Sequence, residues 1–107
     1  MPPTRLETFR AMVAKNPGNA LARFGLATEA LKEGKYEEAA EQLRAYLGMY
    51  DDEGNAYGRL AEALEQLGRT DEAREALRTG IEVSRRNGHP GMASEFEMKL
   101  EELEEIE

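Results

Sequence analysis

The residues that could do chemistry begin with the single histidine, His89, which lies in a Gly-His-Pro-Gly sequence. An imidazole can act as a metal ligand or as a general base near neutral pH. For either role, His89 would need partners from elsewhere in the fold. We therefore expect it to be a solvated turn residue.

A calcium loop is a second candidate, because the segment 51–62 superficially resembles one. Asp51, Glu53, Asn55 and Glu62 fall at its first, third, fifth and twelfth positions, where oxygen ligands would bind the ion. The sixth position requires glycine for a sharp turn, and Ala56 occupies it. We therefore expect acidic residues at the start of a helix, near the positive end of its dipole.

A basic surface is a third candidate, because arginines gather in the segment 69–86 and could contact RNA or an acidic partner. Acidic residues are interleaved with these arginines, which favours ion pairs along one helix and with the acidic end of the chain. The arginines are Arg69, Arg74, Arg78, Arg85 and Arg86, and the expected partners are Asp71, Glu72, Glu75, Glu82 and the last helix.

Other catalytic chemistries lack their residues. The chain has no cysteine, which excludes a disulfide, a zinc–thiolate site and a thiol nucleophile. No Gly-Lys-Ser/Thr phosphate loop occurs, and the 22 acidic residues are too many to single out an acid–base pair. The sequence predicts no catalytic residue, no metal, no cofactor and no enzymatic activity.

Length and charge set further limits. A chain of 107 residues suits a single domain spanning residues 1–107. A net charge of −8 disfavours binding to nucleic acid or to an anionic membrane. No apolar run approaches the roughly 20 residues needed to cross a bilayer, and residues 1–5 lead into no signal-peptide core. A cytoplasmic location is the expectation.

The elements that carry these residues come from an internal repeat. Residues 20–50 laid over residues 54–84, a shift of 34, share nine identities, where ordinary composition would give about two. The identities are Ala22/Ala56, Leu26/Leu60, Ala27/Ala61, Gly34/Gly68, Glu38/Glu72, Ala39/Ala73, Glu41/Glu75, Leu43/Leu77 and Arg44/Arg78. The middle of the chain therefore consists of two copies of one sequence repeat.

The sequence pattern of each unit predicts two antiparallel helices. Apolar residues recur with a period near 3.6 on either side of Gly34 and of Gly68, with no alternation of period two. Both glycines fall where a helix end favours a left-handed residue. Small residues at Ala27, Ala39 and their counterparts would let the two helices approach closely.

These residues resemble the tetratricopeptide repeat family, whose 34-residue pattern places large and small residues at fixed offsets. The resemblance covers about residues 4–87 and departs at Arg23, at alanine in place of the family's Leu-Gly glycine, and at the missing closing proline. The matched positions are Leu26, Ala27, Gly34, Ala39 and Leu43 in one copy, and Tyr57, Leu60, Ala61, Leu64, Gly68, Ala73 and Leu77 in the other.

The fold class expected from repeat and resemblance is all-α, an α–α superhelix or solenoid. We expect an N-terminal half-repeat helix at 4–15, a first repeat at 20–52, a second repeat at 54–87, a break over 85–91 and an acidic capping helix at 91–106. The capping helix would place Met92, Phe96, Leu100 and Leu103 on one apolar face.

The resemblance also implies where a partner would bind, since the family binds peptides or protein segments on a concave face lined by first helices. The implied residues are Leu21, Phe24, Thr28, Leu31 and Lys32 in the first unit, and Asn55, Gly58, Arg59, Glu62, Glu65 and Gln66 in the second. Phe24 and Thr28 stand where some relatives carry a lysine and an asparagine that hold a C-terminal carboxylate. Chaperone tails are therefore not expected as ligands.

Alternatives remain open at this stage. Phe24 and Leu31 could form an apolar anchor with Arg59 and Lys32 as polar selectors, or Phe24, Leu21 and Leu31 could be buried by neighbouring helices. The leading hypothesis is a protein-binding adaptor that is a monomer or a weak homodimer. The alternative is a homo-oligomeric structural module, or a subunit of a larger assembly.

Overall fold

Residues 1–105 are described by a computed structural model in which every regular element is a helix. The helices are α1 (Arg5–Lys15), α2 (Ala20–Lys32), α3 (Tyr36–Met49), α4 (Asn55–Gln66), α5 (Thr70–Arg86) and α6 (Pro90–Glu105). No strand occurs within that span. The all-α fold class is confirmed, and Ile106, the last residue of the predicted capping helix, lies outside the described residues.

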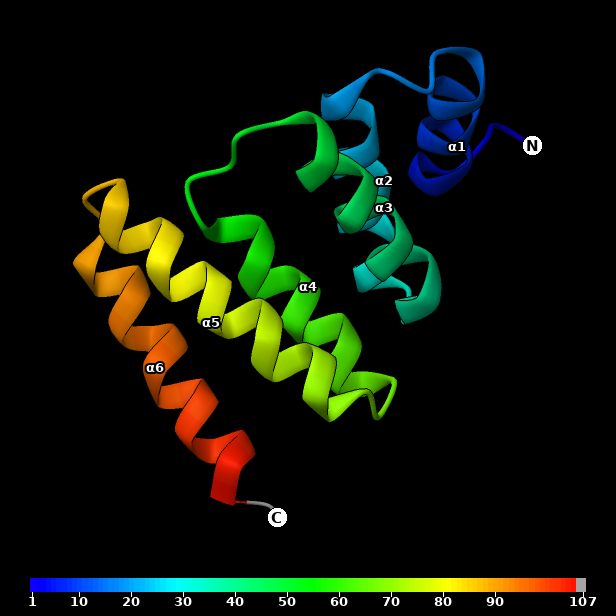
Figure 1. Cartoon of the computed structure of the whole chain (residues 1–107). Helices are drawn as coiled ribbons and strands as arrows, with labels where there is room; N and C mark the ends of the chain where they lie inside the picture. Colours follow the sequence, from blue (N-terminus) through cyan, green and yellow to red (C-terminus); the bar gives the residue numbers. More distant parts are fainter. Residues whose placement is uncertain (106–107) are drawn as a thin grey trace. The chain divides into compact units, whose positions relative to one another are not determined.

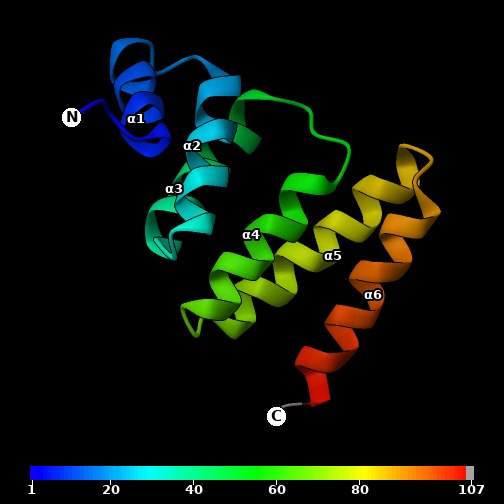
Figure 2. The same cartoon turned by 180° about the vertical axis from the view of Figure 1, so that it is seen from behind.

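The helices form two compact units, Met1–Asp51 and Asp52–Glu107. In the first, α2 packs on both α1 and α3, and in the second, α5 packs on both α4 and α6. Figure 1 shows the successive helices of each unit running antiparallel, and Figure 2 shows the same from behind. The single domain expected for residues 1–107 stays a prediction.

Glycines end the first helix of each repeat. Gly34 and Gly68 have φ values of 72° and 75°, a left-handed conformation that costs glycine little. The amide after each glycine then donates to a carbonyl five residues back, Lys35 N to Ala30 O and Arg69 N to Leu64 O, both at 2.8 Å. These bonds satisfy carbonyl groups at the helix end and turn the chain into the second helix.

The break predicted over residues 85–91 is wrong in length, because α5 continues through Arg85 and Arg86. A third left-handed glycine, Gly88 with φ 79°, ends the helix, and His89 N donates to Ser84 O at 2.8 Å. Pro90 then opens α6, a position where its missing N–H costs nothing. The glycine, rather than the arginine pair, decides where the helix stops.

A capping box starts α1. The Thr4 hydroxyl accepts from Glu7 N at 3.1 Å, and the Glu7 carboxylate accepts from Thr4 N at 2.9 Å. The hydrogen bond from the Thr4 backbone lowers the pKa of Glu7. Arg10 of α1 holds Glu38 of α3 with two hydrogen bonds of 2.7 and 2.8 Å. The half-repeat helix is thus tied to both later helices of its unit.

The repeat positions lie in the core. Each is at most 3% exposed, so the small residues sit where helices pack and the leucines fill the space between them. These positions are Leu26, Ala27, Ala39, Leu43, Leu60, Ala61, Ala73 and Leu77.

Candidate binding groove on α4 and α6

A groove of about 510 Å³ lies on the second unit, within the range of ligand-binding clefts. It lies between side chains of α4 and α6, with one residue contributed by α5. Its lining residues are Asn55, Gly58, Arg59, Ala61, Glu62, Glu65 and Gln66 from α4, Leu77 from α5, and Phe96 and Lys99 from α6.

The start of α4 is set by Asp52, which is 9% exposed. One of its carboxylate oxygens accepts hydrogen bonds from Gly54 N at 2.8 Å and Ala56 N at 3.0 Å. These amides have no partner within the helix, so the carboxylate caps it and complements its dipole. The acidic segment therefore starts a helix, as predicted, and Asn55–Gln66 is helical.

Phe96 occupies a socket made of two glycines. A Cβ on Gly58 of α4 would lie 2.6 Å from Phe96 Cε1, and a Cβ on Gly80 of α5 would lie 3.1 Å from the same ring. Only glycine leaves room for the ring at such distances. Phe96 is half-buried and lines the groove, so it gives the groove an aromatic surface.

Charges of both signs border this aromatic surface. Lys99 Nζ lies 3.2 Å from Glu65 on α4 and 3.6 Å from Glu102 on its own helix. The hydrogen bond with Glu65 raises the pKa of Lys99. Arg59 is half-buried and Glu62 is exposed on the same side of α4. The arrangement can hold an apolar side chain and hydrogen-bond an adjoining backbone or polar group.

The predicted site residues of the second unit come together: Asn55, Arg59, Glu62 and Gln66 all line this groove. The sequence reasoning did not assign Phe96 and Lys99 to it. A signal was present, since a further shift of 34 carries Glu62 to Phe96 and Glu65 to Lys99. The last helix thus continues the register of the first helices.

The predicted residues of the first unit lie on α2 with differing exposure. Leu21 is 77% exposed, whereas Phe24 and Leu31 are half-buried. The Phe24 ring lies 5.0 Å from that of Tyr46, which in turn stacks on Tyr50 at 5.3 Å. These aromatic contacts join α2 and α3 within the first unit. The helical spacing of the aromatic residues favours packing from repeat to repeat, which stays a prediction.

The polar members of the α2 set make local contacts. The Thr28 hydroxyl donates to the carbonyl of Phe24 at 2.9 Å, and Lys32 lies 3.2 Å from the buried Glu29. Both bonds stay within the helix, so this half of the predicted site presents Leu21 and the exposed Lys32 to solvent.

His89 lies in the turn before α6, as expected, and its partly exposed side chain also contacts Glu53. Its Nε2 lies 2.5 Å from Glu53 Oε1, and its side chain is 41% exposed. The pair joins the segment before α4 to the turn before α6. Among the described residues, no group of three or more metal-ligating side chains occurs.

The arginines of α5 pair as predicted. Four pairs lie on α5 or just before it: Arg69 with Glu72, Arg74 with Asp71, Arg78 with Glu75, and Arg86 with Glu82. Two further pairs reach α6: Arg78 with Glu104, and Arg85 with Glu97. The basic helix is thus neutralised by its own acidic neighbours and by the last helix.

The family model of the tetratricopeptide repeat matches residues 30–89, more than half of the chain, so the chain belongs to that family. Its members typically act as non-catalytic protein–protein interaction modules. No curated protein is significantly similar to this chain. Among residues 1–105, no helix has the length and apolar character needed to traverse a bilayer.

Proposed function

We propose that this protein is a non-catalytic adaptor that binds a short segment of another protein in the groove between α4 and α6. The observation that carries the proposal is the convergence of Asn55, Arg59, Glu62 and Gln66 on one groove with the aromatic ring of Phe96. An apolar surface bordered by a few polar groups is typical of a site that orients a ligand.

The chemistry of the groove defines the segment it would accept. Phe96 offers contact to one apolar side chain, and Arg59 and Gln66 offer hydrogen-bond donors to the carbonyls of an extended peptide. The surface is small, so binding in the micromolar range or weaker is expected. By the 34-residue correspondence, a separate binding surface is proposed on α2 of the first unit, formed by Leu21, Phe24, Thr28, Leu31 and Lys32.

A displayed peptide library, selected on the whole chain, tests the proposal. Enriched peptides are synthesised with a fluorescent label, and their affinity is measured for the wild type, Arg59→Glu and Phe96→Ala. Lys35→Glu, which makes the same charge change on an exposed residue before α3, is the control. Both groove variants should bind about tenfold more weakly or worse, a loss of about 1.4 kcal/mol.

Folding of each variant is verified by circular dichroism and thermal unfolding. A library that yields no enriched peptide, or peptides that bind Arg59→Glu and Phe96→Ala as well as the wild type, would refute the groove as the binding site.

A further inference from the structure

The repeat register identifies a face of α6 that is exposed although its counterpart on α4 is covered. A shift of 34 carries Tyr57, Leu60, Ala61 and Leu64 of α4 to Gly91, Ser94, Glu95 and Met98 of α6. The α4 residues are buried or half-buried in a helix that packs on α5. All four α6 residues are exposed, Met98 by 64%.

The helix α1 shows the complementary situation. A shift of 68, two repeats, carries Ala73, Ala76 and Gly80 of α5 to Arg5, Thr8 and Met12 of α1. The three α5 residues are buried, whereas the three α1 residues are exposed, Met12 by 41%. By the repeat register, α6 therefore exposes the face that α4 packs against α5, and α1 exposes the face that α5 packs against α4.

The two exposed faces are complementary in size. In the second unit, a Cβ on Gly80 would lie 2.9 Å from Tyr57 Cβ, so the large residue of α4 packs over the glycine of α5. The corresponding pair is Gly91 on α6 and Met12 on α1, with the large and small residues exchanged. A Cβ on Gly91 would meet no atom within 4 Å, so this position is open to an incoming side chain.

The two faces are also complementary in charge. The buried alanines Ala61 and Ala73 correspond to Glu95 on α6 and Arg5 on α1, an acidic and a basic residue. Over its whole length, α1 carries three basic residues and one acidic residue, net +2, whereas α6 carries six acidic residues and one lysine, net −5. Opposite fields of this kind favour encounter and fix orientation.

We propose that α6 of one copy of this chain packs against α1 of the next copy. The two helices then pack on each other as α4 and α5 do within one copy. The contact is head-to-tail, because two different surfaces meet, and it can continue from copy to copy. The exposed ion pair and one methionine contact contribute little free energy, so assembly is weak and appears as concentration rises.

Charge reversal tests this contact with the whole chain. The mass-average molar mass is measured by sedimentation equilibrium for the wild type, Arg5→Glu, Glu95→Arg and an equimolar mixture of the two variants. The wild-type mass should rise with concentration and fall back in about 0.5 M salt, where the Debye length is a few ångströms. Each variant alone should associate at least fivefold more weakly, because it opposes like charges across the contact.

The mixture is the decisive measurement. Each variant presents one reversed and one native face, so both faces of one variant match those of the other, and the mixture should regain wild-type association. Lys35→Glu and Glu41→Arg, with the same charge changes on exposed residues away from both faces, should associate as the wild type does. Arg5 Nε also lies 3.5 Å from Glu29, so thermal unfolding of Arg5→Glu verifies its fold.

A wild type that stays monomeric up to about millimolar concentration would overturn the proposal, as would a mixture that associates no better than the separate variants. Arg5 and Glu95 do not line the groove between α4 and α6. Either result therefore bears on self-assembly alone, and the peptide-binding experiment tests the adaptor function separately.

Discussion

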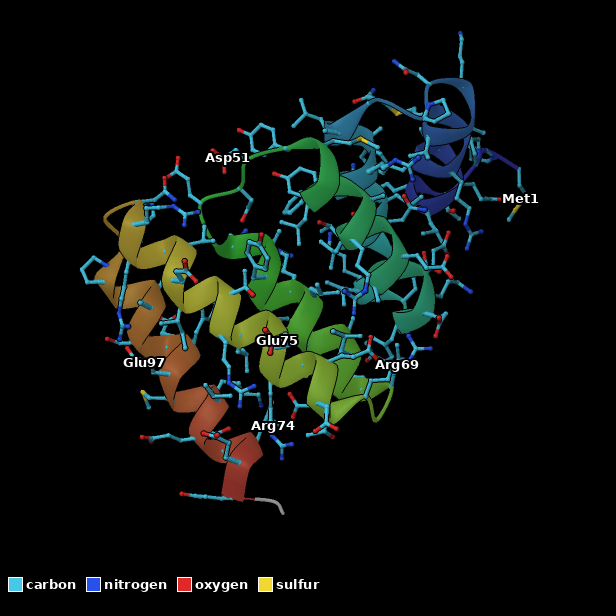
Figure 3. All side chains as sticks on the ribbon, viewed as in Figure 1. Met1, Asp51, Arg69, Arg74, Glu75 and Glu97 are labelled. Atoms are coloured by element: carbon cyan, nitrogen blue, oxygen red, sulfur yellow. The ribbon has the colours of Figure 1, made fainter. Side chains whose placement is uncertain are left out.

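Arg74 Nη2 donates a hydrogen bond of 2.8 Å to the main-chain carbonyl oxygen of Leu103. A second bond, from Nη1 to Asp71 at 2.9 Å, holds the guanidinium in place. The last carbonyl groups of a helix lack partners within it, and Arg74 supplies one from α5. Figure 3 shows Arg74 on α5 near the end of α6, where the Leu103 side chain is 2% exposed. The position corresponds to Ala40 in the first repeat.

Arg74→Ala should therefore loosen α6 and lower the stability of the second unit. Arg74 is 6% exposed, and leaving the buried carbonyl of Leu103 without its donor costs about 1–3 kcal/mol. The melting temperature should fall by about 5–15 °C, and hydrogen exchange should accelerate in α6. Arg78→Ala is the control, because its longer pairs with Glu75 and Glu104 are exposed and contribute at most about 1 kcal/mol. Equal losses for the two variants would show that the Leu103 contact is unimportant.

Gly58→Ala should destabilise the second unit although alanine favours helix. A Cβ at this position would lie 2.6 Å from the Phe96 ring and would displace it, at a cost of about 1–3 kcal/mol that outweighs a propensity gain of about 1 kcal/mol. Urea unfolding measures the difference. Gly48→Ala on α3 is the control, since a Cβ there would meet nothing within 4 Å, and it should be neutral or stabilising.

The double variant Gly58→Ala with Phe96→Leu tests the mechanism. Removing the ring should recover part of the stability lost on Gly58→Ala, so the two changes should be non-additive. If the losses of unfolding free energy from the two changes are additive, the Phe96 ring does not clash with a side chain at position 58.

Ala39→Leu and Ala73→Leu should each lower the melting temperature. Both alanines are 0% exposed, and a larger side chain must separate the packed helices at about 1–3 kcal/mol. Differential scanning calorimetry gives the shift for each. Ala45→Leu, at a half-buried position of α3, should lower the melting temperature less. If neither Ala39→Leu nor Ala73→Leu changes the melting temperature, the helix pairing inferred from the repeat is wrong.

The repeat made most of the fold predictable, because apolar periodicity and left-handed glycines at Gly34 and Gly68 act locally and occur twice. The end of α5 was missed because the polar Arg85 and Arg86 looked like a loop, whereas the α5 helix continues through both until Gly88 ends it. The α4 half of the candidate groove came from the family resemblance, which implies binding positions on the first helix of each repeat. Phe96 did not, because its placement depends on two glycines, Gly58 and Gly80, from different helices.

Acid should weaken the link between α1 and α3. Hydrogen bonds from Arg10 lower the pKa of Glu38 below its ordinary value of 4.5, and Lys35 adds to the effect. A carboxyl with a lowered pKa in the folded state stabilises the protein above its unfolded pKa and loses that contribution as pH falls through the folded pKa. The free energy of unfolding should therefore decline as pH drops below about 4.5.

Urea unfolding at pH 7 and pH 3 isolates this contribution. Glu38→Gln should be less stable than the wild type at pH 7, because the charged pair is lost, and the difference in stability should narrow toward pH 3 as Glu38 takes up a proton. Glu41→Gln, on an exposed residue of the same helix, is the matched control for removing one acidic charge. A gap between wild type and Glu38→Gln that is the same at both pH values would show that the carboxylate of Glu38 does not stabilise the fold through Arg10.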